Sequence, residues 1–367
     1  MQNAEPIPVT VLTGFLGSGK TTLLNHLVRQ PAMSDALVVI NEFGDIGLDH
    51  RLVAEGDEHT VVEMSSGCLC CTIRGDLSRS VQQAVEQLNQ REARPVSRMI
   101  IETTGLADPA PILQTLMTDH WLAQRFRLDG VVCLVDAANG LSTLHAHGES
   151  QRQAAVADCL LLTKTDLVGG TRLNDLSRQL AEINPAAEQI EVLNGEIDAA
   201  RLTARRLPAS AKDAPQAQGW LGAGAYLQVS SFSSVSEGTG ASVSIGTGAC
   251  GAPTPMLSVS NDAPVSRHGE QIRSFCFTVE TPIAAEVLED WLDLLLSLLG
   301  DRMLRIKAIV NVANRDQPLA LHGVQHIFHP PVPLPPDACP DGVSRFVFIT
   351  SGVAADTVTQ LFTYFDS

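Results

Sequence analysis

The residues with the clearest chemical potential form a glycine-bounded loop near the start of the chain. Residues 9–24 read VTVLTGFLGSGKTTLL, and residues 14–21 match the pattern G-x-x-x-x-G-K-[ST] in full. An apolar run precedes the loop and apolar positions at helical spacing follow it, which indicates strand, loop and helix. Glycine allows successive N–H groups to turn toward phosphate oxygens, and the helix adds the positive end of its dipole. The pattern therefore predicts a phosphate-binding loop.

Within this loop, each residue type has a predicted role. Lys20 would reach the β- and γ-phosphates of a nucleotide, where its charge assists catalysis. Thr21 would hold Mg²⁺ through its hydroxyl. The other predicted nucleotide-binding residues of this loop are Gly14, Gly17, Ser18, Gly19 and Thr22.

A second chemical position lies at the end of an apolar run further along the chain. Residues 98–105 read RMIIETTG, which predicts a buried strand ending in Glu102. An acid at the end of a strand beside a phosphate loop organises Mg²⁺ or water, although many such proteins use Asp. We therefore predict a catalytic role for Glu102 and expect the backbone N–H of Gly105 to sense a γ-phosphate. A solvated strand end is the alternative.

A base-recognition signal follows the apolar residues 158–162, where the chain continues as Thr163, Lys164, Thr165 and Asp166. In N-K-x-D motifs the Asp carboxylate accepts hydrogen bonds from guanine N1–H and the exocyclic amine, and adenine offers no N1–H. The Lys stem covers the face of the base. Thr163 replaces the usual Asn, so the motif is weaker than usual. After a phosphate loop, it indicates guanine over adenine.

Three cysteines, Cys68, Cys70 and Cys71, fall within four residues in the sequence SSGCLCC. Thiolates bind Zn²⁺ and other soft or borderline metals. The spacing differs from the C-x-x-C of zinc ribbons, so we expect two of the three to bind with a carboxylate or a His completing the site. A redox-active pair and buried structural thiols are the alternatives.

Composition limits the class of protein. The chain has 367 residues, 44% of them hydrophobic but only 4% aromatic, which favours an aliphatic α/β core with buried parallel strands. Its net charge of −16 argues against nucleic acid or an anionic membrane as a partner. We see no secretory signal and no apolar stretch long enough to cross a bilayer. The cytoplasm is the expected compartment, where cysteines stay reduced.

The sequence predicts three segments along the chain. Residues 1–207 are expected to form a P-loop domain with a mostly parallel sheet, and residues 208–270, rich in Ser, Gly, Ala and Pro, a linker or insertion. Residues 271–367 are expected to form a small α+β domain. Its expected strands are 272–279, 304–313, 318–328 and 345–350, and its expected helices 284–299 and 354–364.

Three histidines in the last segment, His322, His326 and His329, raise the question of a second metal site. On one continuous strand, His322 and His326 would share a face but lie ~13 Å apart, too far to share one ion. We therefore interpret them as polar strand positions.

Several motifs agree in order with a known family. GFLGSGKTTLLNHL, NEFGDIGLDH, SSGCLCC, IIETTGLADP and TKTD, with LRIKAIVNVAN and LHGVQHIFHPP, together resemble the CobW-like family of P-loop GTPases. The resemblance covers nearly the whole chain except residues 208–267. It implies a GTPase domain, a CobW-type C-terminal domain and a GTP-dependent metallochaperone. It also implies zinc or a similar divalent ion at Cys68, Cys70 and Cys71.

The chain departs from that family pattern at three places. Many relatives carry a His-rich run before the C-terminal domain, whereas this chain has only His268 there. Some relatives have a Glu just before the N-E-F-G stretch, where this chain has Ile40. Thr163 is the third departure. The candidates for the ligand that completes the thiolate site are Glu42, Asp45 and His50.

These observations lead to one hypothesis with alternatives. Residues 41–50 form an acidic, glycine-punctuated loop after a predicted strand, which is either a first switch or an ordinary solvated loop. The cysteine motif lies between this loop and residues 102–105, and a γ-phosphate with Mg²⁺ orders switch loops. We expect GTP hydrolysis, slow in the isolated protein, to drive delivery of zinc to a client metalloprotein. The alternatives are a zinc buffer or sensor, a cobalt-handling factor for cobalamin or cobalt-enzyme assembly, and a P-loop kinase with redox cysteines. Oligomerisation is left open.

Overall fold

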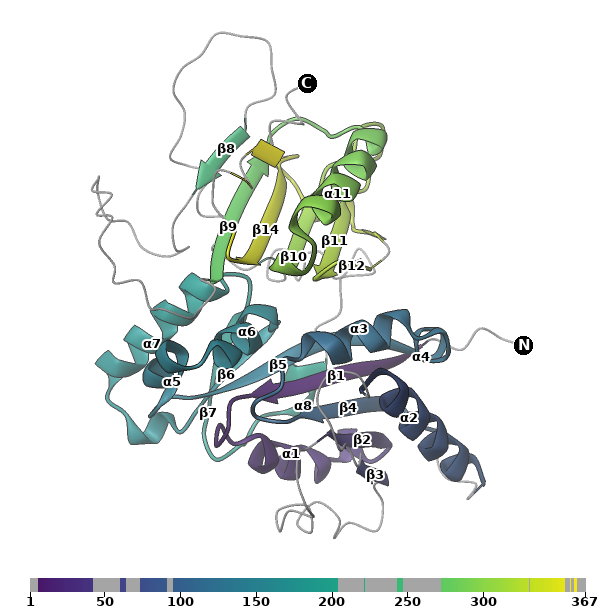
Figure 1. Ribbon diagram of the computed structural model, residues 1–367, viewed down its shortest axis with the longest axis vertical. Coiled ribbons are helices and arrows are strands. Elements are labelled where there is room, and N and C mark those ends of the chain that lie inside the picture. The colour runs from purple at the N-terminus through teal and green to yellow at the C-terminus, as the bar shows by residue number, and fades with distance from the viewer. Residues whose placement is uncertain are drawn as a thin grey trace. The chain divides into compact units, whose positions relative to one another are not determined.

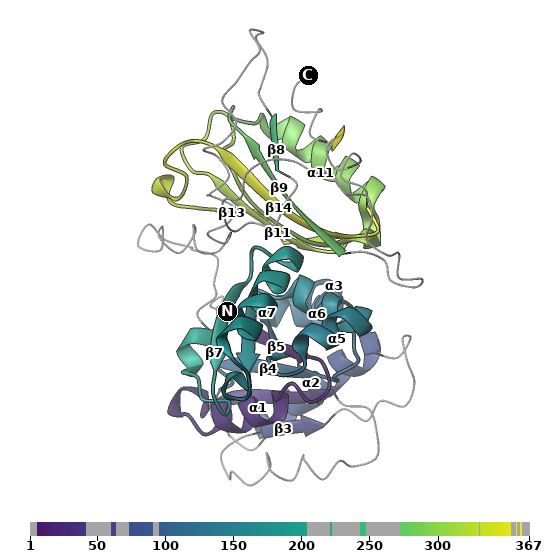
Figure 2. The ribbon, with the colours of Figure 1, turned by 90° about the vertical axis from the view of Figure 1, so that its left-hand side faces the viewer.

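The computed structural model describes residues 6–41, 60–63, 73–90, 95–203, 221, 243–246, 272–329, 331–353, 357 and 360–361. The chain divides into two compact units, shown in Figures 1 and 2. The first comprises residues 1–176 and 187–206, and the second comprises residues 177–186 and 207–367.

The first unit is built on a parallel sheet of seven strands in the order β3-β2-β4-β1-β5-β6-β7. Its core strands are aliphatic and almost fully buried, as expected for a parallel sheet covered on both faces. The phosphate-loop strand β1 lies between β4 and β5. The strands are β1 (Ile7–Gly14), β2 (Ala36–Asn41), β3 (Thr60–Glu63), β4 (Arg98–Thr103), β5 (Phe126–Asp136), β6 (Cys159–Thr163) and β7 (Glu188–Val192). The predicted α/β fold is confirmed.

Helices cover both faces of this sheet. Helices α1 (Lys20–Val28) and α8 (Ala199–Thr203) pack on one face of the sheet. Their aliphatic cluster includes Leu24, Leu27 and Leu202. Figure 1 shows α3 and α1 on opposite sides of strands β1 and β4. The helices in this part of the chain are α1 (Lys20–Val28), α2 (Ile73–Gln90), α3 (Ala110–Thr118), α4 (His120–Arg125), α5 (Gly140–Ala146), α6 (Gly148–Val156), α7 (Gly170–Ile183) and α8 (Ala199–Thr203).

The second unit contains an antiparallel sheet in the order β12-β11-β10-β14-β9-β8, with β13 paired to β11. The helix α11 (Ala285–Leu299) packs on one face, where the rings of Trp291 and Phe346 meet edge to face at 5.2 Å. The indole Nε1 of Trp291 donates a hydrogen bond to the Leu361 carbonyl at 3.0 Å. The strands are β8 (Val243–Gly246), β9 (Ile272–Val279), β10 (Met303–Val310), β11 (Leu319–Val324), β12 (Ile327–Phe328), β13 (Val332–Pro333) and β14 (Ser344–Ser351).

The strand predicted over residues 318–328 is wrong in one respect. The chain turns at Gln325, whose φ is 52°, and β12 pairs back on β11. His322 and His326 therefore do not lie on one continuous strand. Instead, the His322 ring stacks on His329 with centroids 4.6 Å apart, and His326 contacts the Asp301 carboxylate at 3.0 Å. In the described part of the chain, no cluster of three or more His, Cys, Asp or Glu side chains could hold a metal ion.

The segment predicted as a linker or insertion contains residues that belong to the second unit. Strand β8 pairs antiparallel with β9 from within residues 208–270, and Leu221 is fully buried in a cluster with Ile309 and Val347. Among the described residues, no helix is both long enough and apolar enough to cross a membrane.

Candidate nucleotide-binding site

The loop predicted to bind phosphate lies between the end of β1 at Gly14 and the start of α1 at Lys20. Gly14, Gly17 and Gly19 have φ values of 139°, 74° and 97°, which side-chain-bearing residues rarely adopt. A Cβ on Gly14 would also lie 2.5 Å from the Leu134 carbonyl oxygen. The loop conformation therefore depends on glycine at these positions.

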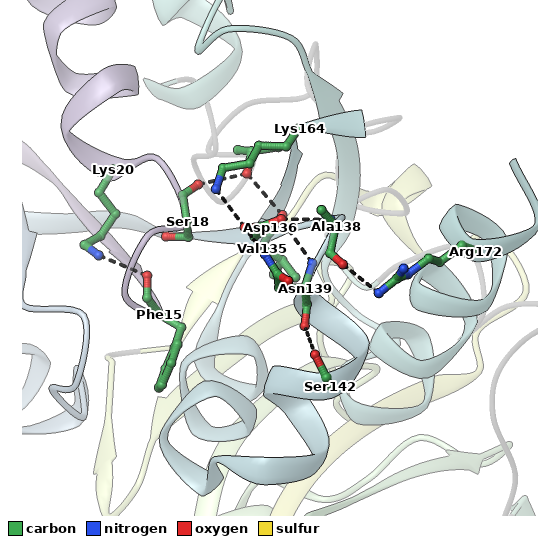
Figure 3. A network of polar contacts seen from close by, with 11 residues as sticks. Phe15, Ser18, Lys20, Val135, Asp136, Ala138, Asn139, Ser142, Lys164 and Arg172 are labelled. Carbon is green, nitrogen blue, oxygen red and sulfur yellow. Dashed lines mark hydrogen bonds and ion pairs between the residues drawn. The ribbon is translucent and has the colours of Figure 1, made fainter. Parts of the chain in front are cut away.

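Lys20 begins α1, and its side chain points back to the loop. Its side chain is 9% exposed, and its Nζ donates hydrogen bonds to the carbonyls of Gly14 at 2.9 Å and Phe15 at 3.3 Å. Figure 3 shows the ammonium turned back toward the loop. Thr21 and Thr22 follow in the first turn of α1, with Thr21 partly buried and Thr22 exposed. The loop thus holds a cation beside its own carbonyls.

The predicted acid lies on the strand next to the loop strand. Glu102 of β4 pairs with Leu12 of β1, and Glu102 is 7% exposed. Gly105 follows shortly after, and a Cβ there would lie 2.8 Å from the backbone N of Leu16. The segment after β4 therefore packs directly on the phosphate loop at Leu16.

The T-K-x-D segment also reaches the phosphate loop, in a way that spacing alone did not indicate. The Thr163 hydroxyl is buried and donates to the Ser18 carbonyl at 2.8 Å. It also lies 3.3 Å from the Val135 carbonyl. Thr163 thus ties the loop to β5 and β6. Asp166, predicted to bind the base, lies exposed in the short helix η3 (Thr165–Leu167).

An acidic residue that the sequence analysis missed, Asp136, supports Lys164. Lys164 has a left-handed backbone with φ 56°, and its Nζ contacts Asp136 Oδ2 at 2.8 Å (Figure 3). The Asp136 carboxylate also accepts hydrogen bonds from the backbone N–H of Ala138 and from the Asn139 amide side chain. Burial opposes ionisation, but these hydrogen bonds hold the pKa of Asp136 below its ordinary value. Its position at the end of a buried strand was the available signal.

A second missed feature is the turn after β7. Asn194 and Gly195 have φ values of 51° and 75°, and a Cβ on Gly195 would lie 3.1 Å from the Leu23 Cα. The turn therefore packs against the first turns of α1. The sequence signal was the Asn-Gly pair directly after a strand, a frequent turn dipeptide.

A cavity of about 290 Å³ borders the phosphate loop. Its walls come from the loop, the end of β5, α5 and α6. Burial raises the pKa of the Cys133 thiol in this wall to about 12, so the thiol is protonated at neutral pH and is a poor metal ligand. The lining includes Phe15, Ser18, Cys133, Asp136, Ser150 and Gln153.

The described residues include the two oxygen-bearing side chains predicted for Mg²⁺ but no cluster of thiolates that could hold a metal. Thr21 on α1 and Glu102 on β4 offer a hydroxyl and a carboxylate, the ligand types that Mg²⁺ prefers. The cysteines predicted to bind zinc lie outside the described residues, as do the candidates for the completing ligand. These residues are Cys68, Cys70, Cys71, Glu42, Asp45 and His50.

Comparisons with known proteins agree with this architecture. Residues 8–191 match the family model described as CobW/HypB/UreG, nucleotide-binding domain. Residues 272–365 match the model described as cobalamin synthesis protein cobW C-terminal domain. The crystal structure of Zn(II)-bound YjiA GTPase from E. coli superposes with a TM-score of 0.68 at 25% identity, covering 99% of this chain and 100% of that chain.

Curated relatives match over the nucleotide-binding part. The zinc chaperone YjiA of Escherichia coli (strain K12) is 40% identical over 195 residues, which cover 53% of this chain and 60% of that protein. The zinc-regulated GTPase metalloprotein activator 1 of Schizosaccharomyces pombe is 35% identical over 200 residues, covering 53% of this chain and 47% of that protein. These matches thus span about half to three fifths of each relative. The two family models confirm the resemblance seen in the sequence, and the chain belongs to the CobW/HypB/UreG family of nucleotide-binding proteins.

Proposed function

We propose that this protein is a GTP-hydrolysing metallochaperone that binds zinc through its C-x-C-C motif and delivers it to a client metalloprotein. The observation that carries the proposal is the convergence of three residues, from two motifs, on the phosphate loop. Gly105 packs on Leu16, Thr163 bonds to Ser18, and Glu102 lies on the strand beside β1. The names of the relatives, a zinc chaperone and a zinc-regulated GTPase, support GTP as the nucleotide and zinc as the metal.

In this proposal each residue acts on one part of the nucleotide. Lys20 exchanges the Gly14 and Phe15 carbonyls for phosphate oxygens, because a phosphate is the stronger partner for an ammonium. The Asp166 carboxylate accepts hydrogen bonds from guanine. Thr21 and Glu102 would hold Mg²⁺, which neutralises phosphate charge when bound. The backbone N–H of Gly105 binds the γ-phosphate.

The cysteine motif is connected to the same edge of the sheet. In a parallel sheet all strands end on one edge, and β3 ends at Glu63 on the edge where β1 delivers the phosphate loop. Residues 64–72, which contain the motif, join that strand to α2. If the nucleotide changes the zinc affinity, zinc must change the nucleotide affinity by the same factor. GTP hydrolysis can then drive release of the metal.

Two measurements test the nucleotide and delivery steps. GTP hydrolysis, with ATP as the comparison, is measured for the wild type and for Lys20→Ala, which removes the ammonium but keeps the loop glycines. We expect slow hydrolysis of GTP, little of ATP, and loss of activity in the variant. Zinc transfer to a fluorescent chelator is then followed with GTP and with a non-hydrolysable analogue. Faster transfer with GTP supports delivery, whereas equal transfer favours a zinc buffer or sensor.

The metal itself needs its own control. A triple mutant of YjiA in which a glutamate and two cysteines are replaced by alanine is also Zn(II)-bound, so that protein binds zinc without those side chains. The test therefore compares the wild type with Cys70→Ser/Cys71→Ser in zinc stoichiometry and affinity. Competition between Zn²⁺ and Co²⁺ at the same site addresses the cobalt-handling alternative, which requires that the site hold Co²⁺ at the Zn²⁺ concentration present.

A further inference from the structure

Gln153 on α6 is a fully buried polar side chain, with 0% of its surface exposed. Its Nε2 donates hydrogen bonds to the carbonyl of Gly105 at 3.2 Å and to the carbonyl of Ala107 at 3.0 Å. One carboxamide therefore uses both of its donors on two carbonyls of the same short segment. That segment follows β4 and the acid Glu102.

The segment held by Gln153 also packs on the phosphate loop. A Cβ on Gly105 would lie 2.6 Å from a methyl carbon of Leu16 and 2.8 Å from its backbone N. The backbone N–H of Ala107 donates to the Thr104 carbonyl at 3.2 Å, which closes a turn around Gly105. Gln153 therefore holds, through two hydrogen bonds, the segment in which Gly105 packs against the loop.

The orientation of the Gln153 carboxamide follows from its partners. Exchanging its nitrogen and oxygen would place an acceptor against two carbonyl oxygens, so the donors must face Gly105 and Ala107. The other end, Oε1, has no partner among the described residues, and Gln153 lines the cavity of about 290 Å³ together with Ser18. Oε1 is itself shielded from solvent. The two hydrogen bonds donated by Nε2 are therefore the polar contacts through which this side chain acts.

We propose that Gln153 is a positioning residue that sets the affinity for GTP relative to GDP by holding Gly105 at the phosphate loop. The inference rests on the proposed function, because it requires that the Gly105 N–H meet the γ-phosphate. GDP lacks that phosphate and so lacks the proposed contact with the Gly105 N–H. Loss of the two donors must therefore weaken GTP binding and leave GDP binding nearly unchanged. Gln153 itself does not touch the nucleotide.

The test compares Gln153→Met with a matched control on the same helix. Methionine keeps the length and burial of the side chain but has no donor. The control is Gln151→Met, because Gln151 also donates through its Nε2 to a backbone carbonyl, that of Leu144 at 2.6 Å, away from the segment. Dissociation constants for a non-hydrolysable GTP analogue and for GDP are measured with Mg²⁺ by fluorescence titration of the full chain. We expect the preference for the GTP analogue to fall about tenfold, equivalent to ~1.4 kcal/mol, in Gln153→Met only.

A second variant, Gln153→Glu, tests the donor directly and covers the case in which the methionine variant fails to fold. A buried carboxyl has a raised pKa, and its protonated form supplies one O–H donor. The GTP preference of this variant should fall at pH 8 and recover in part as the pH is lowered to 6. A role limited to packing would give no such pH profile.

Three results would overturn the inference. An unchanged preference in both Gln153 variants excludes a positioning role, and an equal loss of GTP and GDP affinity indicates a general structural role. If the wild type does not bind guanine nucleotides, the proposed function fails and the inference falls with it. In the first two cases, a wild type that binds and hydrolyses GTP leaves the proposed function intact, and only the inference is overturned.

Discussion

Replacing Thr163 by valine removes one hydroxyl and leaves the shape of the side chain nearly unchanged. The hydroxyl is buried and donates to the Ser18 carbonyl at 2.8 Å. In Thr163→Val that carbonyl loses this donor, and leaving a buried acceptor unsatisfied costs about 1–3 kcal/mol. The sequence predicted a weakened base contact at this position. The structure instead predicts that Thr163→Val weakens the attachment of the phosphate loop to β6.

The free-energy cost of Thr163→Val can be measured by thermal unfolding and by GTP binding. For a unit of roughly 200 residues, 1 kcal/mol corresponds to a shift of about 2–4 °C in the unfolding temperature, so a cost of 2 kcal/mol predicts about 4–8 °C. Nucleotide binding requires an ordered loop. If about 1 kcal/mol of ordering must be supplied on binding, the dissociation constant for GTP rises about fivefold.

A matched control separates this effect from the general cost of losing a threonine hydroxyl. Thr118 is exposed at the end of α3, and its hydroxyl donates to the Gln114 carbonyl at 2.9 Å. We expect Thr118→Val to change the unfolding temperature by about 1 °C or less, because water replaces the lost donor. If Thr163→Val matches the wild type in both unfolding temperature and GTP affinity, the bond to Ser18 does not hold the loop.

Three further predictions concern the same unit. Gly105→Ala should lower affinity for a GTP analogue at least tenfold in a fluorescence titration, because the new Cβ meets the backbone of Leu16 at 2.8 Å. Asp136→Asn should lower stability to denaturant at pH 7. The folded pKa of Asp136 lies below its ordinary value of 3.8, so the carboxylate stabilises the fold above that pH. The difference in stability between Asp136→Asn and the wild type should therefore shrink as the pH falls below about 4. Cys133, with its pKa raised to about 12, should resist iodoacetamide at pH 8 until the protein is unfolded, as read by mass spectrometry.

Each of these has a result that contradicts it. An unchanged affinity for the GTP analogue in Gly105→Ala would show that the close approach of Gly105 to Leu16 is not needed for nucleotide binding. A stability difference for Asp136→Asn that persists unchanged to pH 3 would show that ionisation of Asp136 does not stabilise the fold. Rapid labelling of Cys133 in the native state would show that the thiol is more accessible than its burial indicates.

Local patterns predicted the parts of the site that are continuous in sequence. The glycines at 14 and 19 mark positions where the backbone has positive φ, and a strand and a helix flank them as predicted. The strand at Ile272–Val279 also has the predicted bounds, because its buried and less buried residues alternate. Where the local physics decides the conformation, the sequence was sufficient.

The contacts that complete the site join residues far apart in the chain. Thr163 and Ser18 are 145 residues apart, and Gln153 and Gly105 are 48 residues apart, so no local spacing predicts either bond. The sequence pattern did not predict helix α6, because the buried positions of that helix include Ser150 and Gln153 and show no regular apolar spacing. The sequence pattern did not predict the turn between β11 and β12, because Gln325, which has a positive φ there, is not a residue type that usually marks turns.

The central claim, that the nucleotide controls the metal, is tested most directly by zinc affinity in two nucleotide states. Chelator competition is measured with a GTP analogue plus Mg²⁺ and again with GDP, on the wild type and on Cys70→Ser/Cys71→Ser. The account predicts a difference of about tenfold between the two states, a coupling of ~1.4 kcal/mol, that disappears in the double variant. Equal zinc affinity in both nucleotide states would contradict it, because GTP hydrolysis could then not drive metal release.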